Sequence, residues 1–236
     1  MLEINKSILT LTEKDDISYI QFNKFKGPDL PSNDSFSKND LLVSYIDDND
    51  SSKDVFSDDD FLEIDGFISN VKDIATLTTA ADCTSILMYD PDKNVYANIH
   101  SGWRGTVLRI VEKALSIMRF EYGCDTRNII CCIGPSIRKE CFLVNEDVVE
   151  IFIDEFSNYT KRYPIIQKTD LTNEKGVQYK LDSNRIIKLM MQDAGVIEEN
   201  IIDSNICTNC NSEYFHSKRK EGADDFNING CLMSLK

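Results

Sequence analysis

The chain has 236 residues, 42% of them apolar and 28% charged, which is enough to bury the core of a single large domain. A formal net charge of −14 repels phosphate backbones and anionic lipid surfaces, so we expect no nucleic-acid or membrane partner and instead a small ligand. No stretch approaches the roughly 18 consecutive apolar residues of a membrane span, and no export signal opens the sequence, which indicates a soluble cytoplasmic protein. The eight cysteines are then expected to be reduced thiols, available as metal ligands.

The predicted elements interleave strands and helices from Ile64 onward, which is typical of an α/β or α+β class with mixed sheets. The acidic run from Asp47 to Asp65 precedes them and predicts a solvated loop with one short strand. In chain order we then expect strands near 74–79, 84–89 and 95–100, a helix over 106–120, a strand over 129–133, a helix after Asn145, a helix over 183–194 stopped by Gly195, and closing strands in "NIIDSNIC" and "CLMSLK".

Two of the helices have clear local signals. The helix over 106–120 shows helical spacing of its apolar residues, which are Val107, Leu108, Val111, Leu115 and Met118. The next helix has Asn145 at its expected N-cap, followed by Glu146 and Asp147 in the first turn and by the apolar residues Val148, Val149, Phe152 and Phe156. Both helices are therefore expected to bury one face.

The turn "DPDK" at 90–93 predicts a β-hairpin between the second and third strands. If Pro91 and Asp92 are its central residues, Cys83 lies opposite His100. Opposed residues have Cβ atoms roughly 4.5 to 5.5 Å apart, so a thiolate and an imidazole could reach one metal ion. A bulge beside such a turn would slip the pair by one residue, making it diagonal or placing it on opposite faces.

The segment "SGWRGT" follows His100 directly and places Gly102 and Gly105 around Trp103 and Arg104. Small residues at the start of a helix let backbone N–H groups approach an anion, and the guanidinium fork of Arg104 suits phosphate or carboxylate. This pattern fits an enzyme that activates water or phosphate against an electrophilic carbon. Spacing alone slightly favours the structural interpretation, in which a buried cysteine, a hydrogen-bonded histidine and a core tryptophan simply pack.

Several motifs in a fixed order resemble the laccase-domain family, whose members are described as polyphenol oxidases or purine nucleoside phosphorylases. They are "TAADC", "HSGWRG", "IGPSIRKECFLV", "LDSNRIIKLMMQDAGV", "NICT" and "FHSKRK". The similarity covers residues 61–236, residues 1–60 diverge, and we expect one domain over 1–236. The resemblance implies a layered α/β/β/α fold and a zinc site of one cysteine and two histidines. It also implies phosphate-dependent cleavage of adenosine, inosine or methylthioadenosine, with deamination of adenosine.

By motif, Cys83 and His100 match the family's cysteine and second histidine ligands, which also makes them candidate catalytic residues. Arg104 matches the arginine of the HxGWRG motif and would hold phosphate together with Gly102 and Gly105. Asp82 would either transfer a proton or orient the loop that carries Cys83. Zinc is the expected metal and copper the weaker alternative, because multicopper chemistry needs many histidines and this chain has two.

One ligand of the family pattern has no counterpart. The family's first histidine lies upstream of an aspartate-glycine pair, here Asp65-Gly66, whereas this chain reads "VSYIDDNDSSKDVF" in that region. Asp47 or Asp48 could supply a carboxylate instead, since zinc accepts oxygen donors. His216, the other histidine, is expected to be structural.

Two alternative functions stay open, the first because of the missing ligand and the second because a cysteine and a histidine can act without a metal. The chain could be a non-catalytic homologue that binds a small ligand, or a metal-free thiol hydrolase with Cys83 as nucleophile and His100 as base.

The remaining candidate residues have simpler expected roles. The pair Cys207-x-x-Cys210 lacks the second pair of a zinc ribbon, even counting Cys131 and Cys132, and is interpreted as structural. Cys141 either lines the pocket or packs. The basic cluster of Lys218, Arg219 and Lys220 either adds to an anion site or forms a solvated turn.

Overall fold

The computed structural model describes residues 64–72, 75–222 and 227–235, together with the backbone of four earlier strands, β1 (Leu2–Asn5), β2 (Ile8–Leu11), β3 (Ile20–Phe25) and β4 (Leu42–Ile46). The predicted acidic loop lies almost wholly outside the described residues, and Asp47 and Asp48 with it. Its last two positions begin β5 (Ile64–Ser69).

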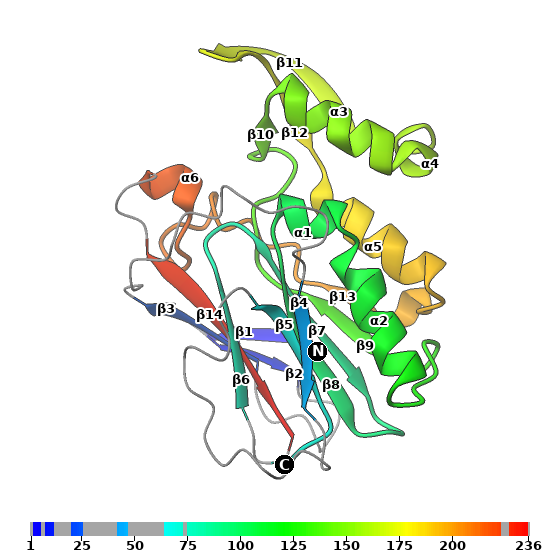
Figure 1. Ribbon diagram of the computed structural model, residues 1–236. Coiled ribbons are helices and arrows are strands. Elements are labelled where there is room, and N and C mark those ends of the chain that lie inside the picture. Colours follow the sequence, from blue (N-terminus) through cyan, green and yellow to red (C-terminus); the bar gives the residue numbers. More distant parts are fainter. Residues whose placement is uncertain are drawn as a thin grey trace.

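Within the described part, two large sheets pack face to face (Figure 1). One has six strands in the order β13-β9-β7-β8-β5-β4, with parallel pairs at both edges and antiparallel pairs between them. Its further members are β7 (Thr84–Asp90), β8 (Val95–Ser101), β9 (Ile130–Ile133) and β13 (Ile201–Asp203). The other has the order β1-β2-β3-β14-β6, with β6 (Ala75–Ala80) and β14 (Ile228–Ser234), and is antiparallel.

A buried asparagine joins the two sheets through side-chain hydrogen bonds. Asn98 of β8 donates its amide to the backbone carbonyls of Thr76 (3.0 Å) and Cys231 (2.9 Å), and its Oδ1 accepts the hydroxyl of Thr78 (2.8 Å). Around it, an apolar cluster fills the space between the sheets with Leu87, Tyr89, Tyr96, Cys132, Phe215, Met233 and Leu235. Since buried polar groups must be paired, these bonds fix how the sheets align as well as how far apart they lie.

The opposite face of the six-stranded sheet is covered by α1 (Trp103–Val107), α2 (Ile110–Phe120) and α5 (Ser183–Asp193), which enclose the main core (Figure 1). The predicted single helix over 106–120 is wrong, because two helices cover this stretch and the chain breaks between them at Arg109, whose φ is 58°. The Arg109 side chain binds Glu155 (2.7 Å) and Glu112 (2.9 Å), and these tertiary bonds stabilise the left-handed turn. The stop after α5 is confirmed by Gly195, at φ 99°.

A smaller group of elements lies at one end of the sheets (Figure 1). It contains β10 (Leu143–Val144), β11 (Ile166–Asn173) and β12 (Gly176–Leu181), with α3 (Glu146–Glu155) and α4 (Ser157–Thr160). Helix α3 begins where predicted, but Asn145 does not cap it, because its Oδ1, the atom that would accept a capping bond, accepts the side-chain amide of Asn173 (3.0 Å). The remaining described helices are η2 (Glu198–Asn200) and α6 (Lys218–Glu221).

The predicted α/β class with mixed sheets is confirmed, and three layers of the expected arrangement, α/β/β, are present in the described residues. A second helical layer is not among them. No helix in the described part is long and apolar enough to cross a membrane.

Candidate active site

The hairpin that carries the site closes through four residues, 91–94, rather than the predicted two. Asp90 Oδ1 accepts the backbone N–H groups of Asp92 (2.8 Å) and Lys93 (3.1 Å), and Asn94 takes the left-handed conformation at φ 54°. Asp90 therefore pairs with Val95, two residues out of the predicted register. The longer turn is stable because the Asp90 side chain satisfies two of its N–H groups.

The predicted direct pairing of Cys83 with His100 is consequently wrong, and Ser85 lies opposite His100. A shift of two residues leaves each side chain on its original face, since strand side chains alternate with period two. Cys83 and His100 still meet diagonally, and the Cys83 sulfur is one of the groups that raise the pKa of His100. Gly102 makes this approach possible, because a Cβ atom there would lie 3.2 Å from Cys83 Sγ and 3.7 Å from His100 Cε1.

Asp65 completes this group, and the sequence analysis did not identify it. In the β5–β8 pairing Gly66 lies opposite Ile99, which sets Asp65 beside His100, and Asp65 Oδ1 is 2.9 Å from His100 Nδ1. The contact leaves the other ring nitrogen, Nε2, for Cys83 or a metal. The sequence signal for this contact was the aspartate-glycine pair at 65–66. Glycine is needed at its second position, because an added Cβ at Gly66 would come 2.4 Å from Ile99 Cδ1.

The electrostatics of this group favour a cation. Burial alone would lower the pKa of His100, but the Asp65 carboxylate and the Cys83 sulfur outweigh it and raise that pKa to about 10. Both side chains of the His100–Asp65 pair are only 23% exposed, so solvent screens them weakly. The Asp65 carboxylate that holds a proton on the imidazole would also favour a cation bound at this group.

Asp82 is buried and occupied by structural partners. Its Oδ1 accepts the hydroxyl of Thr208 (2.7 Å), its Oδ2 accepts the backbone N–H of Arg219 (2.8 Å), and its carbonyl accepts the N–H of Ile137 (2.9 Å). Its φ of 81° is strained for a non-glycine residue, and these bonds offset the strain. Of the two roles left open, the arrangement favours orienting the loop that carries Cys83.

A cavity of about 380 Å³ opens beside these residues. Its polar lining includes Asp65, Cys83, His100 and Arg104, and its apolar lining includes Trp103 and Phe142. Lys218 and Arg219 also face the cavity, so two members of the basic cluster belong to this site. The Arg219 guanidinium lies over the Phe142 ring, 5.7 Å from its centroid.

Arg104 lies where it could receive an anion. Its guanidinium lies 4.4 Å from the centre of the Trp103 ring, and within the described residues it forms no ion pair. The helix that contains it starts at Trp103 rather than at Thr106 and is only five residues long, so its dipole contributes little. Gly105 lies in this helix, where an added Cβ would make only ordinary contacts, the nearest at 3.7 Å to Ile110.

The described residues provide two of the three expected metal ligands. No third cysteine, histidine, aspartate or glutamate in the described ranges joins Cys83 and His100 to form a set with ligand atoms within 4.8 Å. His216 does not line the cavity, and its Nδ1 is 2.9 Å from Glu221 Oε1. Asp47 and Asp48, the predicted carboxylate substitutes, are outside the described residues.

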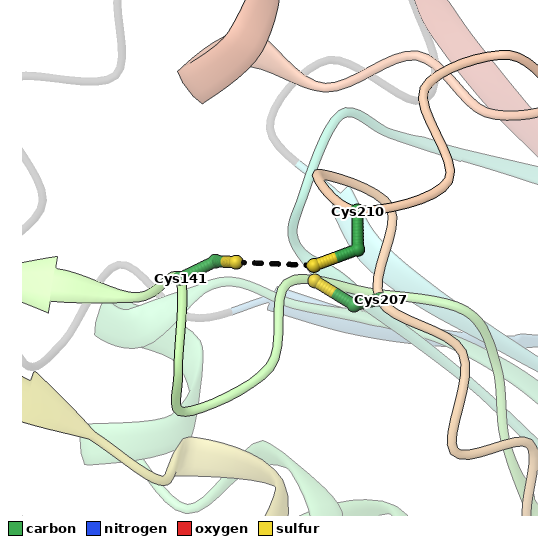
Figure 2. A group of neighbouring side chains, drawn as sticks. All are labelled: Cys141, Cys207 and Cys210. Carbon is green, nitrogen blue, oxygen red and sulfur yellow. Dashed lines mark hydrogen bonds between the residues drawn. The ribbon is translucent and has the colours of Figure 1, made fainter.

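The other seven cysteines divide into a cluster of three and four core thiols, which are Cys124, Cys131, Cys132 and Cys231. Cys131 and Cys132 are buried in β9, and burial raises the pKa of Cys131 and raises that of Cys132 to about 12. Cys207 and Cys210, by contrast, lie next to Cys141 (Figure 2), with the three sulfurs within 4.8 Å of one another. No local signal predicts this meeting, because Cys141 is distant from the pair in sequence.

Comparison with known proteins supports the resemblance seen in the motifs. Residues 39–234 match the model of a family described as "Multi-copper polyphenol oxidoreductase laccase". The structure is similar to that of the Bacillus licheniformis hypothetical protein YfiH, with a TM-score of 0.76 and 20% identity over 98% of this chain and 97% of that one. That likeness concerns the fold.

Curated relatives carry more specific names. The chain is 32% identical over 167 residues to the purine nucleoside phosphorylase CA_C1699 of Clostridium acetobutylicum, covering 70% of this chain and 65% of the relative. It is 30% identical to adenosine deaminase RL5 from an unknown prokaryotic organism, covering 67% and 58%. It is 27% identical to the human purine nucleoside phosphorylase LACC1, covering 73% and 38%. The chain thus matches about two fifths to two thirds of the length of these relatives.

Proposed function

Because this chain belongs to the family described as multi-copper polyphenol oxidoreductase laccase, we propose that it is a cytoplasmic enzyme that cleaves purine nucleosides with phosphate and also deaminates adenosine. The observation that carries the proposal is the meeting of Cys83, His100 and Asp65 with Arg104 around one cavity. Relatives named as purine nucleoside phosphorylases and an adenosine deaminase support the substrate class.

The cavity lining suits a nucleoside and an anion at once. A volume of about 380 Å³ falls in the range of small-ligand pockets. Trp103 and Phe142 offer aromatic surfaces against which a purine could stack. Arg104 would hold phosphate through its planar fork, and Lys218 and Arg219 add positive charge to a protein whose overall charge is −14.

Zinc fits the donor set of Cys83 and His100, since thiolate sulfur and imidazole nitrogen are its common ligands. Asp65 would fix the His100 ring through Nδ1, the usual support for a metal-bound histidine. A bound zinc would supply Lewis acidity or an activated water in this cavity. Copper oxidase chemistry fits less well, because one of the two histidines, His216, is held by Glu221 away from the cavity lining.

The reaction requires two reactants to be aligned. In phosphorolysis a phosphate oxygen bonds to C1′ of the ribose while the bond from C1′ to the purine nitrogen breaks, and the departing purine takes up the proton that the phosphate gives up. In deamination a water adds at C6 of adenine and ammonia departs. Arg104 would lower the cost of placing anionic phosphate beside Asp65 and Cys83, and holding both reactants in one cavity would lower the entropic barrier.

Product analysis tests the proposal. Adenosine, inosine and methylthioadenosine would each be incubated with zinc-supplemented protein, with and without phosphate, and resolved by chromatography. We expect free purine base only with phosphate, and inosine from adenosine without it. The absence of any product from all three nucleosides would overturn the proposal and favour a non-catalytic binding protein.

A further inference from the structure

Three thiols meet outside the cavity of Cys83. Cys141 lies just before β10, and Cys207 and Cys210 lie on the loop after β13 (Figure 2). The sulfurs of Cys141 and Cys210 are 3.4 Å apart, and all three sulfurs lie within 4.8 Å of one another. Zinc–sulfur bonds of about 2.3 Å in a tetrahedral site place sulfurs about 3.8 Å apart, so one ion could bind all three with little movement.

The two loops that carry these cysteines are already joined. The backbone N–H of Ser136 donates to the carbonyl of Ile206, and the N–H of Thr208 donates to the carbonyl of Ser136, both at 3.2 Å. The Arg138 guanidinium donates to the same Ile206 carbonyl (3.3 Å) and pairs with Asp203 (2.7 Å). The positions of the sulfurs therefore follow from a backbone framework that exists before any ion binds.

The sulfur of Cys207 has an environment unlike that of the core cysteines. The C-x-x-C loop folds so that this sulfur and that of Cys210 both lie near the sulfur of Cys141. The carbonyl of Cys207 in turn accepts the N–H (3.0 Å) and the side-chain amide (2.8 Å) of Asn211. These bonds hold the loop in the conformation that places its two sulfurs beside Cys141.

We propose that Cys141, Cys207 and Cys210 form a second metal site, which binds one zinc-type divalent cation through three thiolates and a water. Cys210 is exposed, which leaves room for that water as the fourth ligand. Binding releases the thiol protons to solvent and changes no oxidation state. Thiolates suit both zinc and copper(I), and the four-coordinate site that a water completes is the geometry of zinc.

The site acts as a structural clamp between the two loops. Thr208, next to Cys207, donates its hydroxyl to Asp82 (2.7 Å), and Asp82 precedes Cys83. An ion that holds Cys207 and Cys141 together would therefore also restrain the loop on which Cys83 is carried. This role is independent of whether the cavity processes nucleosides.

A cadmium titration tests the site in the full chain. The background is Cys83→Ser, reduced and freed of metal, so that the thiolate of the nucleoside cavity is absent. We expect one equivalent of Cd²⁺ to produce a thiolate-to-metal charge-transfer band in the near ultraviolet, and one equivalent of Zn²⁺ to raise Tm. Adding Cys210→Ser should remove about a third of the absorbance and at least halve the gain in Tm. The matched control Cys124→Ser, which alters a buried cysteine outside the cluster, should leave both unchanged.

Cys210 is exposed, so its serine variant should fold, and circular dichroism would verify this. The proposal fails if the Cys83→Ser protein binds no Cd²⁺, or if Cys141→Ser and Cys210→Ser leave the absorbance and the gain in Tm unchanged. A disulfide between Cys141 and Cys210 in air, without Cd²⁺ binding by the reduced protein, would also overturn it.

Discussion

Gly102 should be the glycine on which the geometry of Cys83 and His100 depends. Its backbone has φ −72° and ψ 177°, a conformation open to alanine, so Gly102→Ala adds no backbone strain. The added Cβ would lie 3.2 Å from Cys83 Sγ, several tenths of an ångström inside an ordinary contact, and 3.7 Å from His100 Cε1. The sulfur must therefore move away from its place beside the imidazole.

A misplacement of about 1 Å near reacting groups can cost about 100-fold in rate, so a shift of several tenths should lower kcat/KM about 10-fold. Zinc affinity should fall by a similar factor, because one ligand is displaced relative to the other. The assay is isothermal titration with Zn²⁺, together with phosphate-dependent release of purine from inosine.

Gly105→Ala is the matched control, three residues along the chain. The added Cβ has no neighbour nearer than 3.7 Å, and alanine favours a helix over glycine by about 0.5–1 kcal/mol. Zinc affinity should be unchanged and Tm should rise by about 1–4 °C. Equal zinc affinities for Gly102→Ala and the parent protein would refute the reasoning.

Three further changes probe the same cavity. In zinc-free protein the raised pKa of His100 stabilises the fold. This stabilisation is complete below pH 6.5, the ordinary pKa of histidine, and is lost as pH rises towards about 10, so Tm should fall over that window. Asp65→Asn should flatten this fall in Tm and weaken zinc binding about 10- to 100-fold. An unchanged Tm profile in Asp65→Asn would contradict this. Arg104→Ala should raise the KM for phosphate about 10- to 100-fold, because it removes a charge-assisted hydrogen bond of about 1.5–3 kcal/mol. A KM within twofold of that of the parent protein would exclude Arg104 from phosphate binding. Iodoacetamide should alkylate Cys83 only in zinc-free protein. Mass spectrometry should find the buried thiols unmodified, because burial raises their pKa; these are Cys124, Cys131, Cys132 and Cys231. Alkylation of Cys83 at saturating zinc would instead favour the thiol hydrolase.

Local pattern was sufficient to predict the hairpin and most strand and helix limits. The alternation of apolar residues and the choice of turn residues are local signals that span a few positions. They predict the ends of β7, β8 and α5 to within about one residue. The shared face of Cys83 and His100 also holds, because the register differs by an even number of residues. The register itself depends on how Asp90 bonds the turn, which the two-residue turn assumption did not include.

Features that depend on distant contacts were not predictable from one sequence. The break before α2 depends on Arg109 reaching Glu155, and the support of His100 by Asp65 depends on the pairing of β5 with β8. The meeting of Cys141 with the C-x-x-C loop likewise requires two segments to lie side by side. In each case the residues could be identified in the sequence, but which residue each of them contacts is decided by the topology of the sheets.

The most direct test of the central claim is the rate of purine release from inosine in phosphate, measured in parallel for the parent protein, Cys83→Ala and Cys124→Ala, all supplemented with zinc. The account predicts turnover by the parent and by Cys124→Ala, and none by Cys83→Ala. Turnover by Cys83→Ala at the parent rate would show that the chemistry occurs elsewhere and would contradict the assignment of this cavity as the active site.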